Sequence, residues 1–383
     1  MQTNAIIRRV NYLTFIFQIH RMIEKIPKEV ITAFAGYSPD LPKHSSGEIT
    51  IEKISGGLIN KSYRVSPKFK PSFLLQQINK NVFKHPEHVQ ENYISLWQYA
   101  KFEFTGLRLP SPLYCGKTST LFIDENENYW RAFEFIDNAW TLTVPQKTWQ
   151  AKATAQTFGK FTAAFSDFNL HNLKTVIPDF HNLRFRYQQF EESLQTELYE
   201  RMEKAIPFIN EVTKRGRYKD FYEMIIESDE FPQRAMHHDA KISNVLFNKV
   251  SSKIICPIDF DTVMPGYFFS DLGDIIRTMS CSEDESSINF INICIRKGFY
   301  EAVLSGYLNV MENQLTDSEK KHIHYSGLLM TYMQAMRFLT DYLKGDLYYH
   351  INYSEQNLDR ANNQLILLKR LEEFLLKNYS IKV

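Results

Sequence analysis

Glycine and cysteine are both scarce in this chain of 383 residues. The 14 glycines are about half of what an average usage of roughly 7% would give, so the only adjacent pair, Gly56 and Gly57, stands out. No two cysteines have the C-x-x-C spacing of a zinc site, and the chain shows no disulfide framework. We therefore expect a reducing compartment, the cytoplasm. The four cysteines are Cys115, Cys256, Cys281 and Cys294.

The chain also lacks an excess of charge and a long apolar run. Lys and Arg total 45 against 44 Asp and Glu, a formal net charge of +1. This balance argues against a nucleic-acid coat or a polybasic membrane binder, although a local basic groove remains open. The best membrane candidate, residues 10–19, is too short to span a bilayer and contains Asn and Gln. We expect neither a nucleic-acid nor a membrane partner.

The first 21 residues loosely resemble a signal peptide, because two arginines precede the apolar run. Charged residues follow at once, however, and no small-residue cleavage site is present. The plainer interpretation is that residues 1–21 are an extension and that Met22 is the native start.

Apolar and aromatic residues are abundant: 44% of the chain is hydrophobic and 14% aromatic, which excludes a mainly disordered chain. The N-terminal third has alternating patterns typical of strands, whereas the remainder has helical periodicity. Strands are expected at 49–54, 59–65, 72–78 and 129–136, and helices at 23–36, where Gly36 ends the helix, at 86–101, with Pro86 at N1, and at 146–168, 183–205, 287–311, 319–343 and 357–378.

A short hairpin, residues 245–247 and 254–260, interrupts the helical part. Asp239 and Asn244 precede its first strand, and Asp259 and Asp261 lie at the end of the second. If the two strands pair antiparallel, Asp239, Asn244 and Asp259 converge at one end of the hairpin. Carboxylate and amide oxygens are ligands that suit Mg²⁺, and a carboxylate outside the metal shell can accept a proton.

These residues resemble the aminoglycoside phosphotransferase and choline kinase group of the protein-kinase-like fold. The matching pattern is H-x-D-x-x-x-x-N, followed about 20 residues later by I-D-F. Further segments resemble the bacterial N-acetylhexosamine 1-kinases, so that the resemblance runs from about residue 28 to 378. The segments are HHDAKISN (237–244), IDFDTVMPG and DLGDIIR (258–277), SGGLINKSYRV (55–65), FLLQQINKNVF (73–83), RFLTDYLKGDLYY (337–349) and NLDRANNQL (357–365).

The resemblance implies an α+β, bilobal, protein-kinase-like enzyme. Its lobes would be a small β-rich N-lobe, residues 22–136, with a hinge at its end, and a larger, mostly helical C-lobe with a β-hairpin insert, residues 137–383. The implied activity is transfer of the γ-phosphoryl group of ATP, the co-substrate, to a small molecule, with Mg²⁺ or Mn²⁺ as cofactor. A monomer or weak homodimer is expected.

The resemblance also implies roles for individual residues. The catalytic set is Asp239 as proton acceptor, Asn244, and Lys241 toward the transferred phosphate. The metal set is Asn244, Asp259 and Asp261. The nucleotide set is Gly56, Gly57, Asn60, Gln76, Gln77, Glu134, Phe135 and Ile136. The acceptor set is Asp239, His181, Arg337 and Tyr348.

Several of these residues have structural alternatives. Lys241 is otherwise a solvated lysine, Asp261 a turn residue, and Arg337 the partner of Asp341 in a salt bridge. His237 and His238 are expected to support the loop rather than to ligate metal. Asp271 is expected to be structural, either capping the following helix or bracing the catalytic loop.

One position departs from the family pattern. Related kinases place Lys or Arg in the third strand to pair with nucleotide phosphates, and this chain has Gln77 there. Neutralisation of the phosphate charge would then depend on the metal and on Lys61, Arg64 or Lys80. This departure leaves open a pseudokinase-like binding or regulatory protein, although Asp239, Asn244 and Asp259 argue against it.

The acceptor expected from the resemblance is the anomeric hydroxyl of an N-acetylhexosamine such as GlcNAc or GalNAc, giving a sugar 1-phosphate. Aminoglycosides, choline, ethanolamine and homoserine are the alternatives within the same fold. The acidic run at residues 280–287 would suit a polycationic aminoglycoside, but we interpret it as a solvated loop.

Overall fold

The computed structural model describes residues 26–37, 49–54, 59–103, 105–195 and 197–382. The chain divides into two compact units, the first formed by residues 1–79 and 112–135 and the second by residues 80–111 and 136–383. The predicted N-lobe, residues 22–136, differs from the first unit because residues 80–111 pack with the second. Within the described part, no helix combines the length and apolar composition that crossing a membrane would require.

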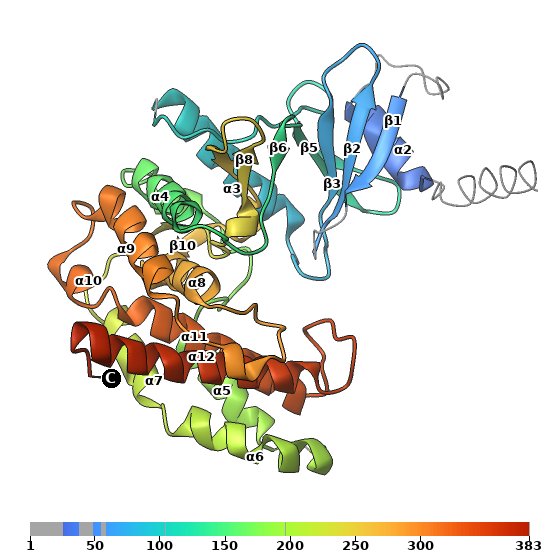
Figure 1. Cartoon of the computed structure of the whole chain (residues 1–383). Coiled ribbons are helices and arrows are strands. Elements are labelled where there is room, and N and C mark those ends of the chain that lie inside the picture. Colours follow the sequence, from blue (N-terminus) through green and yellow to red (C-terminus); the bar gives the residue numbers. More distant parts are fainter. Residues whose placement is uncertain (1–25, 38–48, 55–58, 104, 196, 383) are drawn as a thin grey trace, which may run out of the picture. The chain divides into compact units, whose positions relative to one another are not determined.

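The first unit is built on a five-stranded antiparallel sheet (Figure 1). Its strand order is β1-β2-β3-β5-β4, and the strands expected from the sequence alternation are confirmed. One face is covered by helix α2 (Lys28–Tyr37), whose Val30, Ala33 and Phe34 are buried in the same cluster as Leu75 and Trp130 of the sheet. The bounds are β1 (Ile49–Ile54), β2 (Lys61–Pro67), β3 (Phe73–Gln77), β4 (Leu121–Ile123) and β5 (Tyr129–Glu134).

The prediction that Gly36 ends its helix is wrong, because α2 continues to Tyr37. A Cβ on Gly36 would lie 2.7 Å from the ring of Phe122, so glycine here permits close packing of the helix on β4. Tyr37 then donates a hydrogen bond from its hydroxyl to the carbonyl of Trp130, at 2.7 Å. The last turn of α2 is therefore fixed to the sheet.

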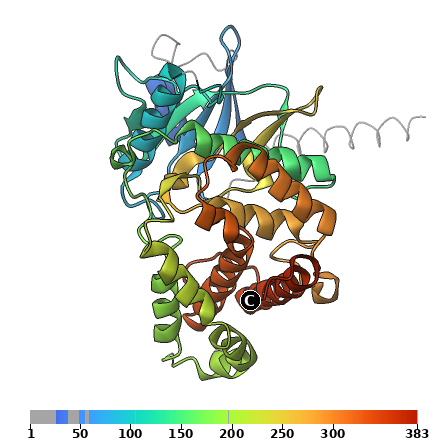
Figure 2. The same cartoon turned by 90° about the vertical axis from the view of Figure 1, so that its left-hand side faces the viewer.

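The second unit is mostly helical (Figures 1 and 2). It contains a large apolar core. Helix α11 runs through this core and packs against α8, α12, α5 and α6, while α4 packs against α9. The helices are α3 (Pro86–Phe102), α4 (Thr148–Ala164), α5 (Leu183–Ser193), α6 (Tyr199–Thr213), α7 (Arg217–Ile226), α8 (Phe269–Ser280), α9 (Lys297–Met311), α10 (Asp317–Lys321), α11 (Tyr325–Leu343) and α12 (Gln356–Tyr379).

Three of the expected helices differ from the structure. Residues 183–205 form two helices, α5 and α6, because α5 ends in a tight turn with hydrogen bonds between residues three apart. The expected helix at 287–311 begins only at Lys297, since Ser282 binds the backbone of Cys294 and directs this segment along an isolated bridge. Residues 319–343 are split between α10 and α11.

Two small sheets in the second unit carry the loops of interest. The expected hairpin is present as β8 (Val245–Asn248) and β9 (Ile254–Pro257), joined by β6 (Ala139–Trp140) to form three strands. A second pair consists of β7 (Arg234–Met236) and β10 (Met264–Gly266). Strands of two or three residues are too short for periodicity to reveal, which is why β6, β7 and β10 were not expected.

Candidate active site

Asp239 and Asn244 lie in the loop that joins β7 to β8. The turn η2 (Ile242–Asn244) brings the Asn244 amide back onto Asp239, where Nδ2 donates to Oδ2 at 2.8 Å and to the Asp239 carbonyl at 2.9 Å. Lys241 Nζ lies 2.9 Å from the same carboxylate oxygen. The Asp239 side chain remains about one-third exposed, at 32%. Burial favours its neutral form, but Lys241, His237 and Asn244 outweigh that effect and hold the pKa of Asp239 below its ordinary value.

The pairing of β8 with β9 brings the end of the hairpin back to Asn244. Val245 pairs with Pro257, and the Ile258 backbone N–H donates to the Asn244 carbonyl at 2.9 Å. Asp259 follows directly, with a φ of +66° in the left-handed region. That conformation is uncommon for any residue with a Cβ and occurs often at functional sites. The hairpin thus places Asp259 beside Asn244, as its register requires.

Asp261 lies in the next turn, η3 (Phe260–Thr262), and is only 4% exposed. Among the described residues, the carboxylates of Asp239, Asp259 and Asp261 do not form a group whose oxygens all lie within 4.8 Å of one another. The amide oxygen of Asn244 and a carboxylate oxygen of Asp259 are hard donors of the kind that Mg²⁺ prefers. The amide nitrogen of Asn244 donates a hydrogen bond to Asp239. The amide oxygen is therefore the atom of Asn244 that can bind a metal.

Asp271 braces the loop from behind. It lies in the first turn of α8, and its two oxygens accept the backbone N–H groups of His237 and His238, at 2.9 and 2.7 Å. The N-cap of α8 is Phe268, so the bracing role is the one that the structure shows. Burial raises the pKa of Asp271 to about 7, against the lowering effect of the two N–H donors.

The two loop histidines are internal supports. His237 Nε2 lies 3.0 Å from the Ile258 carbonyl, and His238 Nδ1 lies 2.7 Å from Ser270 Oγ. Burial lowers the pKa of each imidazole to about 4, so both are neutral at pH 7. His238 also has a positive φ of 62°, and Gly266 leaves room for its ring, since a Cβ there would lie 2.4 Å away. This agrees with the expectation that they support the loop.

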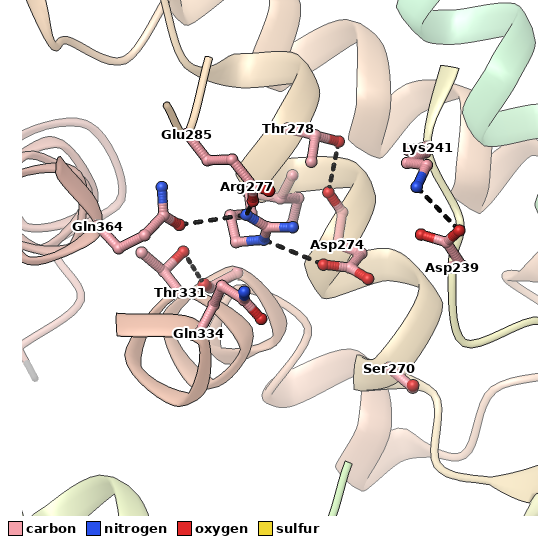
Figure 3. A network of polar contacts seen from close by, with 12 residues as sticks. Asp239, Lys241, Ser270, Asp274, Arg277, Thr278, Glu285, Thr331, Gln334 and Gln364 are labelled. Atoms are coloured by element: carbon pink, nitrogen blue, oxygen red, sulfur yellow. Dashed lines mark hydrogen bonds and ion pairs between the residues drawn. The ribbon is translucent and has the colours of Figure 1, made fainter. Parts of the chain in front are cut away.

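A group of charged side chains is centred on Arg277 of α8, and Figure 3 draws it together with Asp239 and Lys241. Arg277 donates from Nε to Asp274 at 3.0 Å, and its Nη1 donates to Glu285 at 2.6 Å. Burial raises the pKa of Asp274, and the charge of Asp239 raises it further, against the opposing effect of Arg277. Glu285 belongs to the acidic run at 280–287, so that run is not simply a solvated loop. Sequence reasoning assigned no role to Asp274, Arg277 or Glu285.

The expected acceptor residues are connected to this loop by contacts. Ser270 Oγ lies 2.7 Å from His238 Nδ1 and 2.5 Å from His181 Nδ1. The His181 ring stacks on Phe180 at 4.5 Å, and the guanidinium of Arg337 lies 5.1 Å from the Phe180 ring centroid. His181, predicted for its motif alone, therefore lies between the loop that carries Asp239 and Arg337 in this series of contacts. Burial holds its pKa well below the ordinary value, and His238 adds to this effect.

Arg337 and Tyr348 line a pocket of about 140 Å³ in the second unit. Arg186 and Lys344 line it as well, so the pocket is rich in cations. Burial and the neighbouring Arg337 lower the pKa of Arg186 to about 10. Tyr348 is 59% exposed, which leaves one aromatic side chain open to a ligand.

The alternative role for Arg337, a salt bridge with Asp341, is not formed among the described residues. Arg337 instead donates to Gln334 at 3.2 Å and lies over the rings of Tyr348 and Tyr349. Asp341 accepts the backbone N–H groups of Tyr348 and Tyr349, at 2.8 and 2.9 Å. The Asp341 carboxylate thus shapes the turn that carries Tyr348. The Arg337 guanidinium has no acidic partner among the described residues.

Of the expected nucleotide residues, Gly56 and Gly57 lie outside the described residues. Asn60 Oδ1 accepts the backbone N–H of Asn79 at 3.0 Å. Of the residues expected at the hinge, Glu134 ends β5 and Phe135 and Ile136 follow it, and the Phe135 N–H donates to the Ser72 carbonyl at 3.2 Å. Ile136 is the residue at which the chain enters the second unit.

Strand β3 carries Gln77 at the position where a basic residue was expected from the family pattern. Gln77 pairs across the sheet with Trp130, whose side chain is fully buried, so Gln77 shares that face. Gln76 lies on the opposite face, where it donates to Ser62 and accepts from Arg131 Nε at 3.1 Å. Arg131 was not expected from the sequence, although a charged residue in the middle of an apolar strand is a usable signal.

Comparison with known proteins identifies the family. Residues 50–311, more than half of the chain, match the family described as "Phosphotransferase enzyme family". The chain belongs to this family. It is a small-molecule kinase that transfers a phosphoryl group to an alcohol, and its α+β fold is that of the protein-kinase-like phosphotransferases.

Several solved structures share the fold of this phosphotransferase. An aminoglycoside phosphotransferase from Alicyclobacillus acidocaldarius subsp. acidocaldarius DSM 446 has a TM-score of 0.57 at 11% identity, covering 86% of this chain and 91% of that one. The amicoumacin kinase hAmiN, in complex with AMP-PNP, Ca²⁺ and Ami, has a TM-score of 0.56 at 12% identity, with coverages of 91% and 95%. A choline kinase from Cryptosporidium parvum Iowa II has a TM-score of 0.51 at 15% identity, with coverages of 92% and 97%.

Proposed function

We propose that this phosphotransferase uses ATP and a divalent cation to phosphorylate the anomeric hydroxyl of an N-acetylhexosamine. The observation that carries the proposal is the contact path to the pocket from His238, the residue before Asp239, through Ser270, His181 and Phe180. It ends at Arg337, whose guanidinium lies over Phe180. A guanidinium and an exposed aromatic ring suit a sugar, because the first donates hydrogen bonds to hydroxyls and the second offers an apolar face.

The charge of the pocket favours a neutral acceptor over a cationic one. Arg186, Arg337 and Lys344 line it, and Asp341 is engaged by backbone N–H groups. An aminoglycoside, choline or ethanolamine would bring positive charge close to two guanidinium groups, an arrangement that like-charge repulsion opposes. Glu285, which could have attracted a polycation, is paired with Arg277.

In the proposed reaction Asp239 accepts the proton of the acceptor hydroxyl as its oxygen bonds to the γ-phosphorus. The bond from that phosphorus to the β–γ bridging oxygen breaks, and ADP leaves with the electron pair. The pKa of Asp239 is held below its ordinary value. The carboxylate therefore stays ionised and can accept the hydrogen bond of the acceptor hydroxyl. Lys241, 2.9 Å from Asp239, provides positive charge next to the transferred group.

Asn244 and Asp259 would hold the divalent cation, and their oxygens fit its preference. When bound, the cation would supply positive charge against the β- and γ-phosphates. In the first unit we assign the phosphate contact that Gln77 cannot make to Arg131, a cation on the opposite face from Gln77 that is hydrogen-bonded to Gln76, another of the expected nucleotide residues.

The test is a screen with γ-labelled ATP and Mg²⁺ over N-acetylhexosamines, neutral hexoses, aminoglycosides, choline, ethanolamine and homoserine. We expect a labelled sugar whose phosphate is anomeric by ³¹P–¹H coupling. Preferred phosphorylation of an aminoglycoside or an amino alcohol would overturn the sugar assignment. Nucleotide binding without product under either Mg²⁺ or Mn²⁺, on every acceptor, would favour the pseudokinase-like binding protein.

A further inference from the structure

Three metal-binding side chains converge at the start of α3, and none of them is assigned a part in phosphoryl transfer. Among the described residues, His85, Glu87 and His88 form the group of three whose ligand atoms all lie within 4.8 Å of one another. His85 Nδ1 is 3.4 Å from Glu87 Oε1. The two imidazole rings stack, with centroids 4.8 Å apart and an interplanar angle of 27°.

Two of the polar atoms in this group are shielded from solvent without a hydrogen bond. His88 Nδ1 and Glu87 Oε2 have no partner within the described part of the chain. Buried polar atoms are nearly always satisfied, and an exception requires an explanation, such as a bound ion. One cation contacting both atoms would satisfy them together, and the His85 imidazole is close enough to join them.

We propose that His85, Glu87 and His88 bind a transition-metal ion of the Zn²⁺ type. Two imidazoles and a carboxylate, with water in the fourth position, form a common donor set for zinc, whereas Mg²⁺ prefers oxygen ligands alone. Zinc bonds of 2.0–2.1 Å in a tetrahedron place neighbouring ligand atoms about 3.4 Å apart. His85 Nδ1 and the other carboxylate oxygen of Glu87, Oε1, already lie 3.4 Å apart. His85 is 63% exposed, so its ring is able to rotate toward the other ligand atoms of the group.

The local backbone favours this arrangement. Pro86 occupies the first helical position and restricts the backbone between the ligands, while His85 and His88 are three residues apart, on the same side of the first turn. The positive end of the helix opposes a cation, but this effect costs less than about one order of magnitude in affinity, and the charge of Glu87 offsets it.

The site is connected to the catalytic region through the same helix. Two turns further along α3, Asn92 donates to the Val263 carbonyl at 2.9 Å, and the Tyr93 ring lies 5.3 Å from that of Phe260. Phe260 is the first residue of the turn that follows Asp259, and Val263 comes directly after that turn. A metal ion on the first turn of α3 therefore stabilises the helix that supports this turn.

The experiment uses the full chain without an affinity tag, stripped of metal with a chelator and kept in excess Mg²⁺. Calorimetric titration with Zn²⁺ is expected to show one equivalent bound, with a melting temperature raised by a few degrees. Co²⁺ in place of zinc is expected to give the visible absorption of a tetrahedral site. The double variant His85→Ala/His88→Ala should bind at least 10-fold more weakly, while the matched control His171→Ala, an exposed histidine in the 3₁₀ turn η1 (Leu170–Asn172), should bind like the parent.

Two milder variants keep the test decisive if the double variant does not fold. His85→Ala changes an exposed side chain, and Glu87→Gln preserves size while removing the charge. Each is expected to weaken Zn²⁺ binding by about 10-fold. Parent affinity in both variants, or no stoichiometric Zn²⁺ binding by the parent chain, overturns the proposal.

Discussion

Replacing Asp239 by Asn tests the proton-accepting role most directly. The Asp239 carboxylate accepts a hydrogen bond from Asn244 Nδ2 at 2.8 Å and forms an ion pair with Lys241 Nζ at 2.9 Å. Asn offers one oxygen in place of two and cannot take the proton of the acceptor. Loss of general-base catalysis typically costs 10²–10⁴ in rate, so we expect kcat to fall by about that factor, or about 3–5 kcal/mol in activation free energy.

The same substitution should leave the fold nearly unchanged. The Asp239 and Lys241 side chains are 32% and 37% exposed, and ion pairs with such access to solvent contribute about 0–1 kcal/mol. The melting temperature should therefore shift by less than about 4 °C.

The assay couples ADP release to an absorbance change and measures nucleotide affinity separately with a fluorescent ATP analogue. Asp229→Asn, which makes the same chemical change at an exposed turn, is the matched control and should keep parent kcat. Parent kcat in Asp239→Asn would refute the base assignment. A large loss of nucleotide binding or of melting temperature would show that Asp239 acts through structure instead.

Three further predictions follow from the site. Arg337→Met should raise KM for the acceptor by about 10–100-fold with a smaller change in kcat, because hydrogen bonds to charged groups contribute about 1.5–3 kcal/mol; an unchanged KM would remove Arg337 from the acceptor site. Arg131→Gln should raise KM for ATP by about 10-fold, and a change in melting temperature alone would assign Arg131 a structural role instead. His237 and His238, with pKa values lowered to about 4 by burial, should remain neutral at pH 6 by NMR and become protonated near pH 6.5 only in the urea-unfolded chain. Since their folded pKa values are depressed, their contribution to stability is complete above about pH 6.5 and is lost as the pH falls toward 4.

The fold could largely be predicted from periodicity because its longer elements have one buried face. Helix α3, with Pro86 at its start and Tyr93 on its buried side, begins at the expected residue. Periodicity failed where local hydrogen bonds redirect the chain, as Ser282 does at the segment before α9. It also missed strands of two or three residues such as β6, since their pairing depends on partners distant in sequence.

The site could be predicted where chemistry follows from spacing along the chain. The return of the hairpin to Asn244 follows from antiparallel pairing, which the short apolar strands indicated, whereas the irregularity of register between Leu246 and Phe247 was not expected. The pairing of Glu285 with Arg277 was not predictable, because the loop that carries Glu285 shows no periodicity. The roles assigned to Asp239 and its neighbours stay predictions until the variants are measured.

The bracing of the catalytic loop by Asp271 has a consequence for how this enzyme can change. Its carboxylate fixes the backbone ahead of Asp239 from within α8, whereas Arg337 and Tyr348 come from α11 and the turn after it. With the roles proposed above, support of the reacting groups and recognition of the acceptor would be encoded in separate segments. Substitutions around Tyr348 would then change the acceptor while leaving the proposed phosphoryl-transfer residues intact, which makes this turn the region to vary in directed evolution.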